Sequence, residues 1–283
     1  MKIAFWSEQP EAGTTFNLAV TACAAVLMHP LSIAVVSGGY HDEMLEKKFF
    51  GKTDCFSWEA ERQHDLEMES ILAAESEEYF AVRGLDCLLR KERREELTEL
   101  AVKANMRQVI RDKMYCLPSS VKPEQEWWHQ DSLFLRMGRV MDAVESYFDL
   151  VFIDCGNRRD DYAQEVLQRA DVCVLNMRQD REHIGDFYQN PPRYRGETFF
   201  LLGKYFEDAL YNRENLQRLY RMEENRLGAI PYNLRLQTAG QMGKIKNGVI
   251  NCMGGGAGCR QGEFARELVR TTNLILKLAG MLA

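Results

Sequence analysis

Residues 2–27, KIAFWSEQPEAGTTFNLAVTACAAVL, decide the fold of this chain. The apolar run Lys2–Trp6 predicts a buried strand, and the alanine-rich run Asn17–Met28 predicts a helix. Ser7–Thr15 (SEQPEAGTT) joins them with one glycine and two threonines. In this layout, backbone N–H groups and a helix N-terminus can hold a phosphate group. The stretch therefore predicts an α/β fold with a candidate anion site near its N-terminus.

The same alternation continues along the chain. Further strands are predicted at Leu31–Ser37, Met114–Pro118, Asp149–Asp154, Val172–Met177, Thr198–Gly203 and Leu227–Pro231. Helices are predicted at Lys91–Met106, Gln130–Ser146, Asp160–Ala170, Asn212–Met222 and Glu263–Leu282. Alternating elements with continuous apolar strands predict a doubly wound, mostly parallel sheet. We expect a single domain over residues 1–283, with an irregular segment at about 51–90.

Small or polar residues follow the predicted strands. They are Ser7, Ser37, Asp154, Asn176, Gly203 and Pro231. In doubly wound sheets, ligands bind at the carboxyl ends of the strands, which share one edge. Asp154 ends the apolar run Val151–Ile153 and would present a carboxylate there, an oxygen ligand suited to Mg²⁺. An aspartate that only caps the next loop is the alternative.

The composition excludes several classes of protein. Hydrophobic residues make up 46% and charged residues 28%, as in ordinary soluble globular chains. The formal net charge of −6 argues against broad, sequence-independent nucleic-acid binding. No apolar run reaches the roughly 18 residues that cross a bilayer. The N-terminus lacks the basic and apolar regions of a signal peptide, which predicts a cytoplasmic protein.

The eight cysteines predict neither a zinc site nor a disulfide framework. None has CxxC spacing, and no Cys/His set has zinc-ligand spacing. Cys155 and Cys173 fall inside apolar strand-like runs, where a reduced cysteine behaves as a small hydrophobic residue. We therefore expect a reduced protein.

Several motifs resemble those of the ParA/MinD-type P-loop ATPases, over most of the chain. They are GTT at Gly13–Thr15 with Asn17–Ala19, YFDLVFIDCG at Tyr147–Gly156, the pair Ala170–Asp171, and IPYN at Ile230–Asn233 followed by Ala239 and Gly243. Together with VLNMRQD at Val174–Asp180, they look most like the TadZ/CpaE branch. Members of that branch localise Flp (tad) pilus or related secretion machinery.

The resemblance implies a three-layer P-loop NTPase fold that forms homodimers and binds assembly proteins. ATP or ADP with Mg²⁺ would be bound weakly or not at all, and membrane contact at the inner face would be indirect or weak. The positions that would contact nucleotide are Gln9, Pro10, Glu11, Ala12, Gly13, Thr14, Thr15, Phe16, Lys204, Pro231, Tyr232 and Asn233. Those that would contact Mg²⁺ are Thr15 and Asp154. No catalytic residue is implied.

The chain departs from the family pattern at its most important positions. Gln9 stands where the first, trans-acting lysine would be, and Thr14 where the phosphate-binding lysine would be. Pro10 and Glu11 replace two glycines. After the second strand, Ser37–His41 replaces an Asp-x-Asp that positions water, with Asp42 a few residues too late. Lys204 stands where the family often places an adenine-reading asparagine.

The missing lysines weaken the expected site. Each charge-assisted contact is worth about 1.5–3 kcal/mol, so two are worth roughly 3–6 kcal/mol, or about 100- to 10,000-fold in affinity. Pro10 also removes one backbone N–H, and Glu11 adds negative charge. Hydrolysis depends on charge stabilisation in the transition state and should suffer more than binding. Lys204 or Arg178 could substitute for a missing cation.

Three functions remain open. The first is a ParA-like localisation or assembly factor of a pilus or secretion system, with little hydrolysis. The second is an active ATPase of DNA partition or septum positioning, and the third is a nucleotide-free scaffold.

Other candidates are weaker. The charged run Lys91–Glu99 is expected to be a solvated helix face. Trp127–Trp128 could bind a partner or pack locally, and Met253–Gly262 is expected to be a connector. The apolar side of the predicted helix Glu263–Leu282 is expected to pack on the sheet rather than on a membrane.

Overall fold

Eight strands form one sheet in the order β3-β4-β2-β5-β1-β6-β7-β8. The computed structural model describes residues 1–39, 43–51, 84–120, 133–180, 184, 194–254 and 260–282. Neighbouring strands are parallel except β3 with β4, so the predicted doubly wound, mostly parallel sheet is confirmed. The strands are β1 (Lys2–Trp6), β2 (Ile33–Ser37), β3 (Arg107–Ile110), β4 (Met114–Leu117), β5 (Leu150–Gly156), β6 (Val172–Met177), β7 (Glu197–Tyr205) and β8 (Leu227–Pro231).

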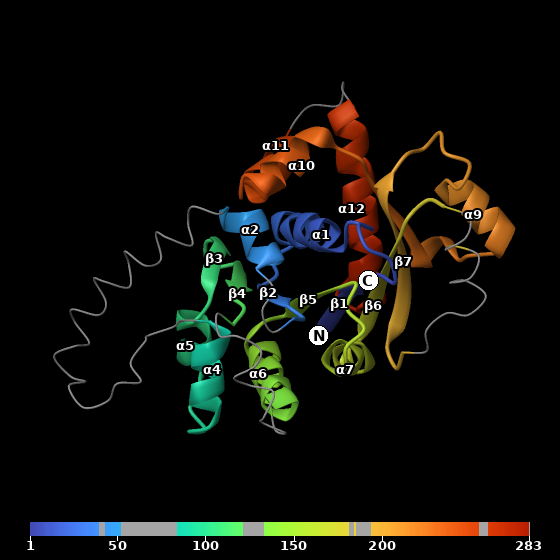
Figure 1. Cartoon of the computed structure of the whole chain (residues 1–283). Coiled ribbons are helices and arrows are strands. Elements are labelled where there is room, and N and C mark those ends of the chain that lie inside the picture. The colour runs from blue at the N-terminus through green and yellow to red at the C-terminus, as the bar shows by residue number, and fades with distance from the viewer. Residues whose placement is uncertain are drawn as a thin grey trace.

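Helices cover both faces of the sheet, which makes three layers (Figure 1). One face carries α1 (Thr14–Met28), α2 (Met44–Phe50), α10 (Leu234–Gln241), α11 (Ile245–Gly254) and α12 (Arg260–Leu278). The opposite face carries α4 (Leu85–Glu92), α5 (Glu99–Ala104), α6 (Leu133–Tyr147), α7 (Asp161–Arg169) and α9 (Arg213–Tyr220). A short 3₁₀ turn, η2 (Glu224–Arg226), precedes β8. Every strand of this sheet except β3 alternates its side chains between two separate hydrophobic cores.

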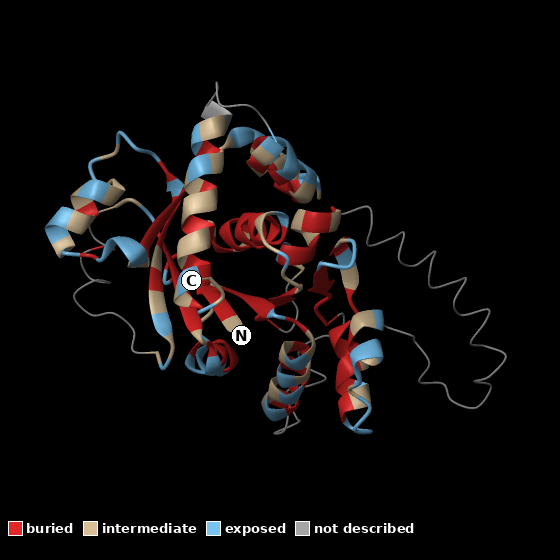
Figure 2. Cartoon of the chain, turned by 180° about the vertical axis from the view of Figure 1, so that it is seen from behind, coloured by how far each residue is buried: buried red, intermediate tan, exposed pale blue. Residues whose placement is uncertain are grey.

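Of the described helices, α1 is the most deeply buried, as Figure 2 shows. Its alanines Ala19, Ala22, Ala24 and Ala25 have no exposed surface. Small side chains let the helix lie close to the sheet on one side and to α11 and α12 on the other. A helix that is apolar on all sides needs such a central place, because no face of it is suited to water.

Helix α12 covers the outer edge of the sheet at β8. The Thr271 hydroxyl accepts a hydrogen bond from the Ala229 N–H (3.0 Å) and donates one to the Ala229 carbonyl (2.9 Å). A Cβ on Gly228 would lie 2.7 Å from the Thr271 methyl group, so glycine is needed there. Phe264 and Leu268 are buried in the core, and the prediction that this helix packs on the sheet is confirmed.

A buried ion pair joins α4 to α6 on the opposite face. The Arg136 Nε donates to the Glu92 carboxylate at 2.8 Å, and Arg139 donates to the same carboxylate at 2.5 Å. Arg136 also donates to the Leu89 carbonyl. Burial alone would raise the pKa of Glu92, but the hydrogen bonds from the two arginines outweigh it and lower that pKa.

The predicted single helix at Lys91–Met106 is wrong. Helix α4 ends at Glu92 and is followed by a turn in which Glu95 has a φ of 58°. The Thr98 side chain then accepts a hydrogen bond from the Ala101 N–H (3.2 Å) and caps the separate helix α5. A threonine that bonds the backbone in this way favours a new helix start over continuation.

Other elements were not predicted at all. They are α2, α10, α11 and the antiparallel strand β3. Helix α4 begins inside the segment expected to be irregular, and residues 52–83 of that segment lie outside the described residues. The predictions for Trp127–Trp128 and for positions 41–42 also fall outside them, as do residues 255–259 of the expected connector. The described ends of that connector are wrongly predicted, because 253–254 belong to α11 and 260–262 belong to α12. None of the described helices is long and apolar enough to cross a membrane.

Candidate functional site

The carboxyl ends of six strands meet along one edge of the sheet, as predicted. Parallel registers place Ser37 beside Asp154, Phe5 beside Asp154, and Phe5 beside Val174. The strand order then continues to Gly203 and Pro231. The edge therefore presents Ser37, Asp154, Ser7, Asn176, Gly203 and Pro231 in that spatial order.

The loop between β1 and α1 is held on this edge by backbone contacts. The Ser7 N–H donates to the Gly156 carbonyl at 2.8 Å, and the Ser7 hydroxyl accepts from the Gln9 N–H at 3.1 Å. Further along, the Ala12 carbonyl lies over β7, where a Cβ on Gly203 would come within 2.2 Å of it. Gly203 is therefore a requirement of the loop, because any side chain there would push the loop away.

Two loop residues have left-handed backbone. Glu11 has a φ of 61° and Gly13 a φ of 83°. Glycine adopts this region without cost, whereas other residues lose roughly 1–2 kcal/mol. Glu11 stands at a position where the resemblance expects glycine, so the loop keeps a glycine-type backbone course without the glycine.

The N-terminus of α1 presents unused hydrogen-bond donors. Gly13 is the N-cap and provides no side chain, and the first intrahelical bond runs from the Asn17 N–H to the Gly13 carbonyl at 2.8 Å. The N–H groups of Thr14, Thr15 and Phe16 have no acceptor among the described residues. Such groups, together with the helix dipole, suit an anion.

Buried amide groups lie beneath this helix start. The Asn17 Nδ2 donates to the Asn176 Oδ1 at 2.8 Å, which ties α1 to β6. The Asn17 Oδ1 and the Gln9 Oε1 are buried without a hydrogen-bond partner in the described part of the chain. Both atoms are hydrogen-bond acceptors, so each requires a donor, such as a water molecule.

Asp154 lies at the centre of the edge and is 1% exposed. Its Oδ1 accepts a hydrogen bond from the Gly156 N–H at 3.1 Å, and its carbonyl accepts from the Gly38 N–H at 2.7 Å. The bond to the Gly156 N–H, two residues along the chain, caps the loop after β5, as the alternative interpretation of Asp154 expects. The described residues contain no group of three or more His, Cys, Asp or Glu side chains that would hold a metal alone. Mg²⁺ at Asp154 and Thr15 would thus need oxygen ligands from phosphate and water.

The positions aligned with the two lysines are both buried. Gln9 is 9% and Thr14 is 7% exposed, whereas Pro10 and Glu11 between them are exposed. A buried Gln9 side chain cannot extend across to another subunit as a trans-acting lysine would. At these two positions the loop therefore differs from the pattern it resembles in the burial of its side chains as well as in their charge.

The residues expected around a base lie at the ends of β7 and β8. Tyr232 is exposed and stacks on Phe206, with ring centroids 5.7 Å apart and an interplanar angle of 26°. The Tyr232 N–H donates to the Tyr205 carbonyl at 3.0 Å, which fixes the pair to β7. Phe206 was not predicted. A paired aromatic surface of this kind can stack on a planar base.

Lys204 and Asn233 are less suited to reading a base. Lys204 follows Gly203, is exposed, and has a φ of 49° where the pairing of β7 with β8 shifts register. The Asn233 side chain accepts a hydrogen bond from the Leu236 N–H at 3.1 Å and caps α10. Pro231, the last residue of β8, is half-buried beside them.

The prediction from the sequence missed Lys48, which belongs to α2 and approaches the same edge. Its aliphatic stem contacts the region of Gly240 and Phe16, and its charge interacts with that of Asp154. No sequence pattern pointed to Lys48, because α2 itself was not predicted.

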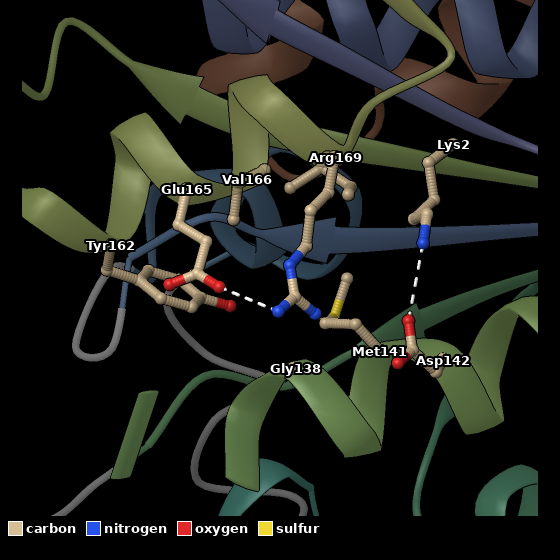
Figure 3. Close-up of a pocket in the computed structure, with 9 residues that line it drawn as sticks. Lys2, Gly138, Met141, Asp142, Tyr162, Glu165, Val166 and Arg169 are labelled. Atoms are coloured by element: carbon tan, nitrogen blue, oxygen red, sulfur yellow. Dashed lines mark hydrogen bonds and ion pairs between the residues drawn. The ribbon is translucent and has the colours of Figure 1, made fainter. Parts of the chain in front are cut away.

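Two cavities lie away from the loop. One has a volume of about 30 Å³, room for a water molecule, and lies between α6 and α7 on the face opposite α1 (Figure 3). Ion pairs from Lys2 to Asp142 (3.3 Å) and from Arg169 to Glu165 (2.8 Å) border it. The other, about 580 Å³, is lined by charged residues around Glu92 and Arg136. Neither adjoins the loop.

The cysteines that the structure describes are free. They are Cys23, Cys87, Cys116, Cys155, Cys173 and Cys252. Cys155 and Cys173 lie fully buried in β5 and β6, and burial raises the pKa of the Cys173 thiol to about 12. These two thiols are core residues, as predicted.

The fold is shared with ParA- and MinD-type ATPases of known structure. A ParA family ATPase from Chlorobium tepidum TLS has a TM-score of 0.66 at 11% identity, over 96% of this chain and 98% of that chain. MinD from Pyrococcus horikoshii OT3, complexed with Mg-ADP, has a TM-score of 0.65 at 13% identity, over 100% and 98%. The MinC:MinD cell division complex of Aquifex aeolicus gives 0.60 at 11%, over 98% and 95%.

At such identities the likeness concerns the fold. No family model matches the sequence, and no curated protein matches it.

Proposed function

We propose that this chain is a ParA-like localisation or assembly factor that acts by weak nucleotide binding and dimerisation, with little or no ATP hydrolysis. One observation carries the proposal: the α1 N-terminus offers unused N–H groups beside the buried Asp154, in a loop without any lysine. The groups that shape an anion site are thus retained. The lysines that stabilise charge in a phosphoryl-transfer transition state are missing.

The described residues fit a nucleoside diphosphate. Phosphate oxygens would accept hydrogen bonds from the N–H groups of Thr14–Phe16, and the base would stack against Phe206 and Tyr232. Thr15 and Asp154 would contribute oxygen ligands to Mg²⁺. The likeness to a MinD structure complexed with Mg-ADP supports this choice of ligand.

The cellular role rests on the sequence motifs that resemble the TadZ/CpaE branch. The proposed process is localisation of a Flp (tad) pilus or related secretion system, through a homodimer that contacts assembly proteins. Pilin and secretion-ATPase genes beside this gene are the expected finding. A neighbouring ParB-type gene would contradict it and favour the DNA-partition alternative.

Calorimetry with Mg-ADP and Mg-ATP, together with a turnover assay, tests the biochemical part. Saturable heat in the high micromolar range is expected, with turnover at background and with binding weakened about tenfold or more in Thr15→Ala. Thr238→Ala, which removes an exposed hydroxyl in α10, is the control and should bind normally. Steady turnover abolished by Thr15→Ala would instead show an active ATPase. If no heat of binding is detected at millimolar nucleotide, the nucleotide-free scaffold is the function that remains.

A further inference from the structure

The loop at the α1 N-terminus lacks positive charge, but a lysine reaches the same place from another element. Lys48 lies on α2, whose Leu45 and Phe49 are buried in the core that contains α1. Figure 1 shows α2 beside α1 at this end of the sheet. An ammonium group delivered from α2 would therefore approach the loop from the side of β2.

The stem of Lys48 is placed by its contacts. A Cβ built on Gly240 of α10 would lie 3.3 Å from the Lys48 Cδ and 3.9 Å from the Phe16 Cδ2. The stem thus runs between α2 and α10 next to Phe16, the residue that follows Thr15. Glycine at position 240 leaves room for it.

The charged end of Lys48 is placed by its electrostatic neighbours. Burial lowers the pKa of the Lys48 amine, and the negative charge of Asp154 acts in the opposite direction. Asp154 pairs in register with Phe5, one residue before the end of β1, where the loop begins. The charged end of Lys48 is therefore within electrostatic range of Asp154.

Lys48 has no ion-pair partner among the described residues, although it is half-buried. Its neighbour Lys47 differs, because Lys47 pairs with Glu43 at 2.8 Å. The charge of Asp154 offsets only part of the cost of this burial, because the pKa of Lys48 remains lowered. A phosphate group held by the α1 N-terminus would supply further compensation.

We propose that Lys48 provides the positive charge that the loop lacks, so that the phosphates of the nucleotide bind between the Lys48 ammonium group and the N–H groups of Thr14–Phe16. This inference rests on the proposed nucleotide binding and names the residue that makes it work. Lys48 acts here as a binding residue.

Calorimetry with inorganic pyrophosphate and with ADP, each in the presence of Mg²⁺, tests the proposal. The wild-type chain should bind both ligands. Lys48→Met should weaken both affinities about tenfold to hundredfold, as loss of one charge-assisted contact implies. Lys48→Arg should retain most of the affinity. Lys47→Met is the matched control and should bind as the wild type does.

Chemical footprinting of the unmodified chain gives a second readout that no folding defect can affect. Acetic anhydride should label Lys48 more slowly when pyrophosphate is present, while labelling of Lys47 stays constant. Equal affinities of the wild type and Lys48→Met, or no protection of Lys48, would overturn the inference and leave nucleotide binding intact. No binding by the wild type under any condition would overturn the proposed function and the inference together.

Discussion

Single residues decide whether the loop between β1 and α1 can hold an anion. Glu11 adopts the left-handed backbone that a glycine would adopt more easily, and Gln9 and Thr14 turn their side chains inward. Packing of the loop therefore holds a left-handed backbone at a residue other than glycine. Gly203 contributes to the position of the loop, because the absence of a side chain there leaves room for the Ala12 carbonyl.

Gly203→Ala should disturb the loop and spare the rest of the fold. The added Cβ would lie 2.2 Å from the Ala12 carbonyl oxygen, so the loop must move away from β7. We expect pyrophosphate affinity, measured by calorimetry, to fall at least tenfold. Gly254→Ala is the control, since a Cβ there meets no atom within 4 Å. Unchanged affinity in Gly203→Ala would show that loop position and binding are independent.

At the scale of elements, α4 and α6 are joined by a buried ion pair as well as by apolar packing. Glu92 receives hydrogen bonds from both Arg136 and Arg139, and Arg136 is itself buried. Such a pair contributes less than its contacts suggest, because both charges lose hydration. Removing Glu92 alone is strongly destabilising, because the charge of Arg136 then stays buried without a partner carboxylate.

Glu92→Gln should lower the free energy of unfolding at pH 7 by about 3–5 kcal/mol. The lowered pKa of Glu92 stabilises the fold above the unfolded-state pKa of about 4.3, and this stabilisation is lost as the pH falls below it. The free energy of unfolding of the wild type, measured by urea titration, should accordingly fall from pH 5 toward pH 3. The fall should be smaller in Glu92→Gln. Glu99→Gln, which removes an exposed pair with Lys103, should change stability by less than about 1 kcal/mol. Parallel pH curves for wild type and Glu92→Gln would contradict the prediction.

At the scale of the whole molecule, the sheet ends in an edge strand that is closed by a helix. Unpaired edge groups invite pairing with other chains. Here the Thr271 hydroxyl occupies both polar groups of Ala229 on the outer side of β8. The described edge at β8 is thus protected by one side chain.

Thr271→Val should therefore destabilise the fold and promote association. The N–H and carbonyl of Ala229 would lose their partner in a buried place, at a cost of about 1–3 kcal/mol. Thermal unfolding should occur at lower temperature, and light scattering should show faster aggregation. Thr238→Val serves as the control, because its hydroxyl bonds the Leu234 carbonyl on an exposed surface. A variant as stable and as monodisperse as the wild type would refute this role of Thr271.

The sequence predicted the parts of the fold that have strong local patterns. The buried strands β2, β5, β6 and β8 are continuous apolar runs, and the polar residues at their ends share an edge because parallel strands must align. The short strand β3 and helices α2, α10 and α11 lack such patterns and depend on contacts distant in sequence. Lys48 was missed for this reason, since its place follows from α2.

The helix boundary at Thr98 shows a second limit of sequence reasoning. The charged run after Glu92 suits a helix equally well with or without a break, and the turn at Glu95 is decided by packing of α4 and α5 against α6. Among the candidate site residues, the loop and Asp154 were placed correctly at the ligand edge. Phe206 was not predicted, because its candidate role depends on stacking against Tyr232, which is distant in sequence.

The central position of β1 has a consequence for synthesis of the chain. Its two neighbours are β5 and β6, which begin near residues 150 and 172. About 150 residues separate the end of α1 from the end of β6, and a ribosome working at about 5–20 residues per second needs roughly 7–30 s to add them. During that time β1 and the apolar helix α1 exist without β6. The nascent chain thus carries an unprotected apolar segment, and its folding yield depends on what shields that segment.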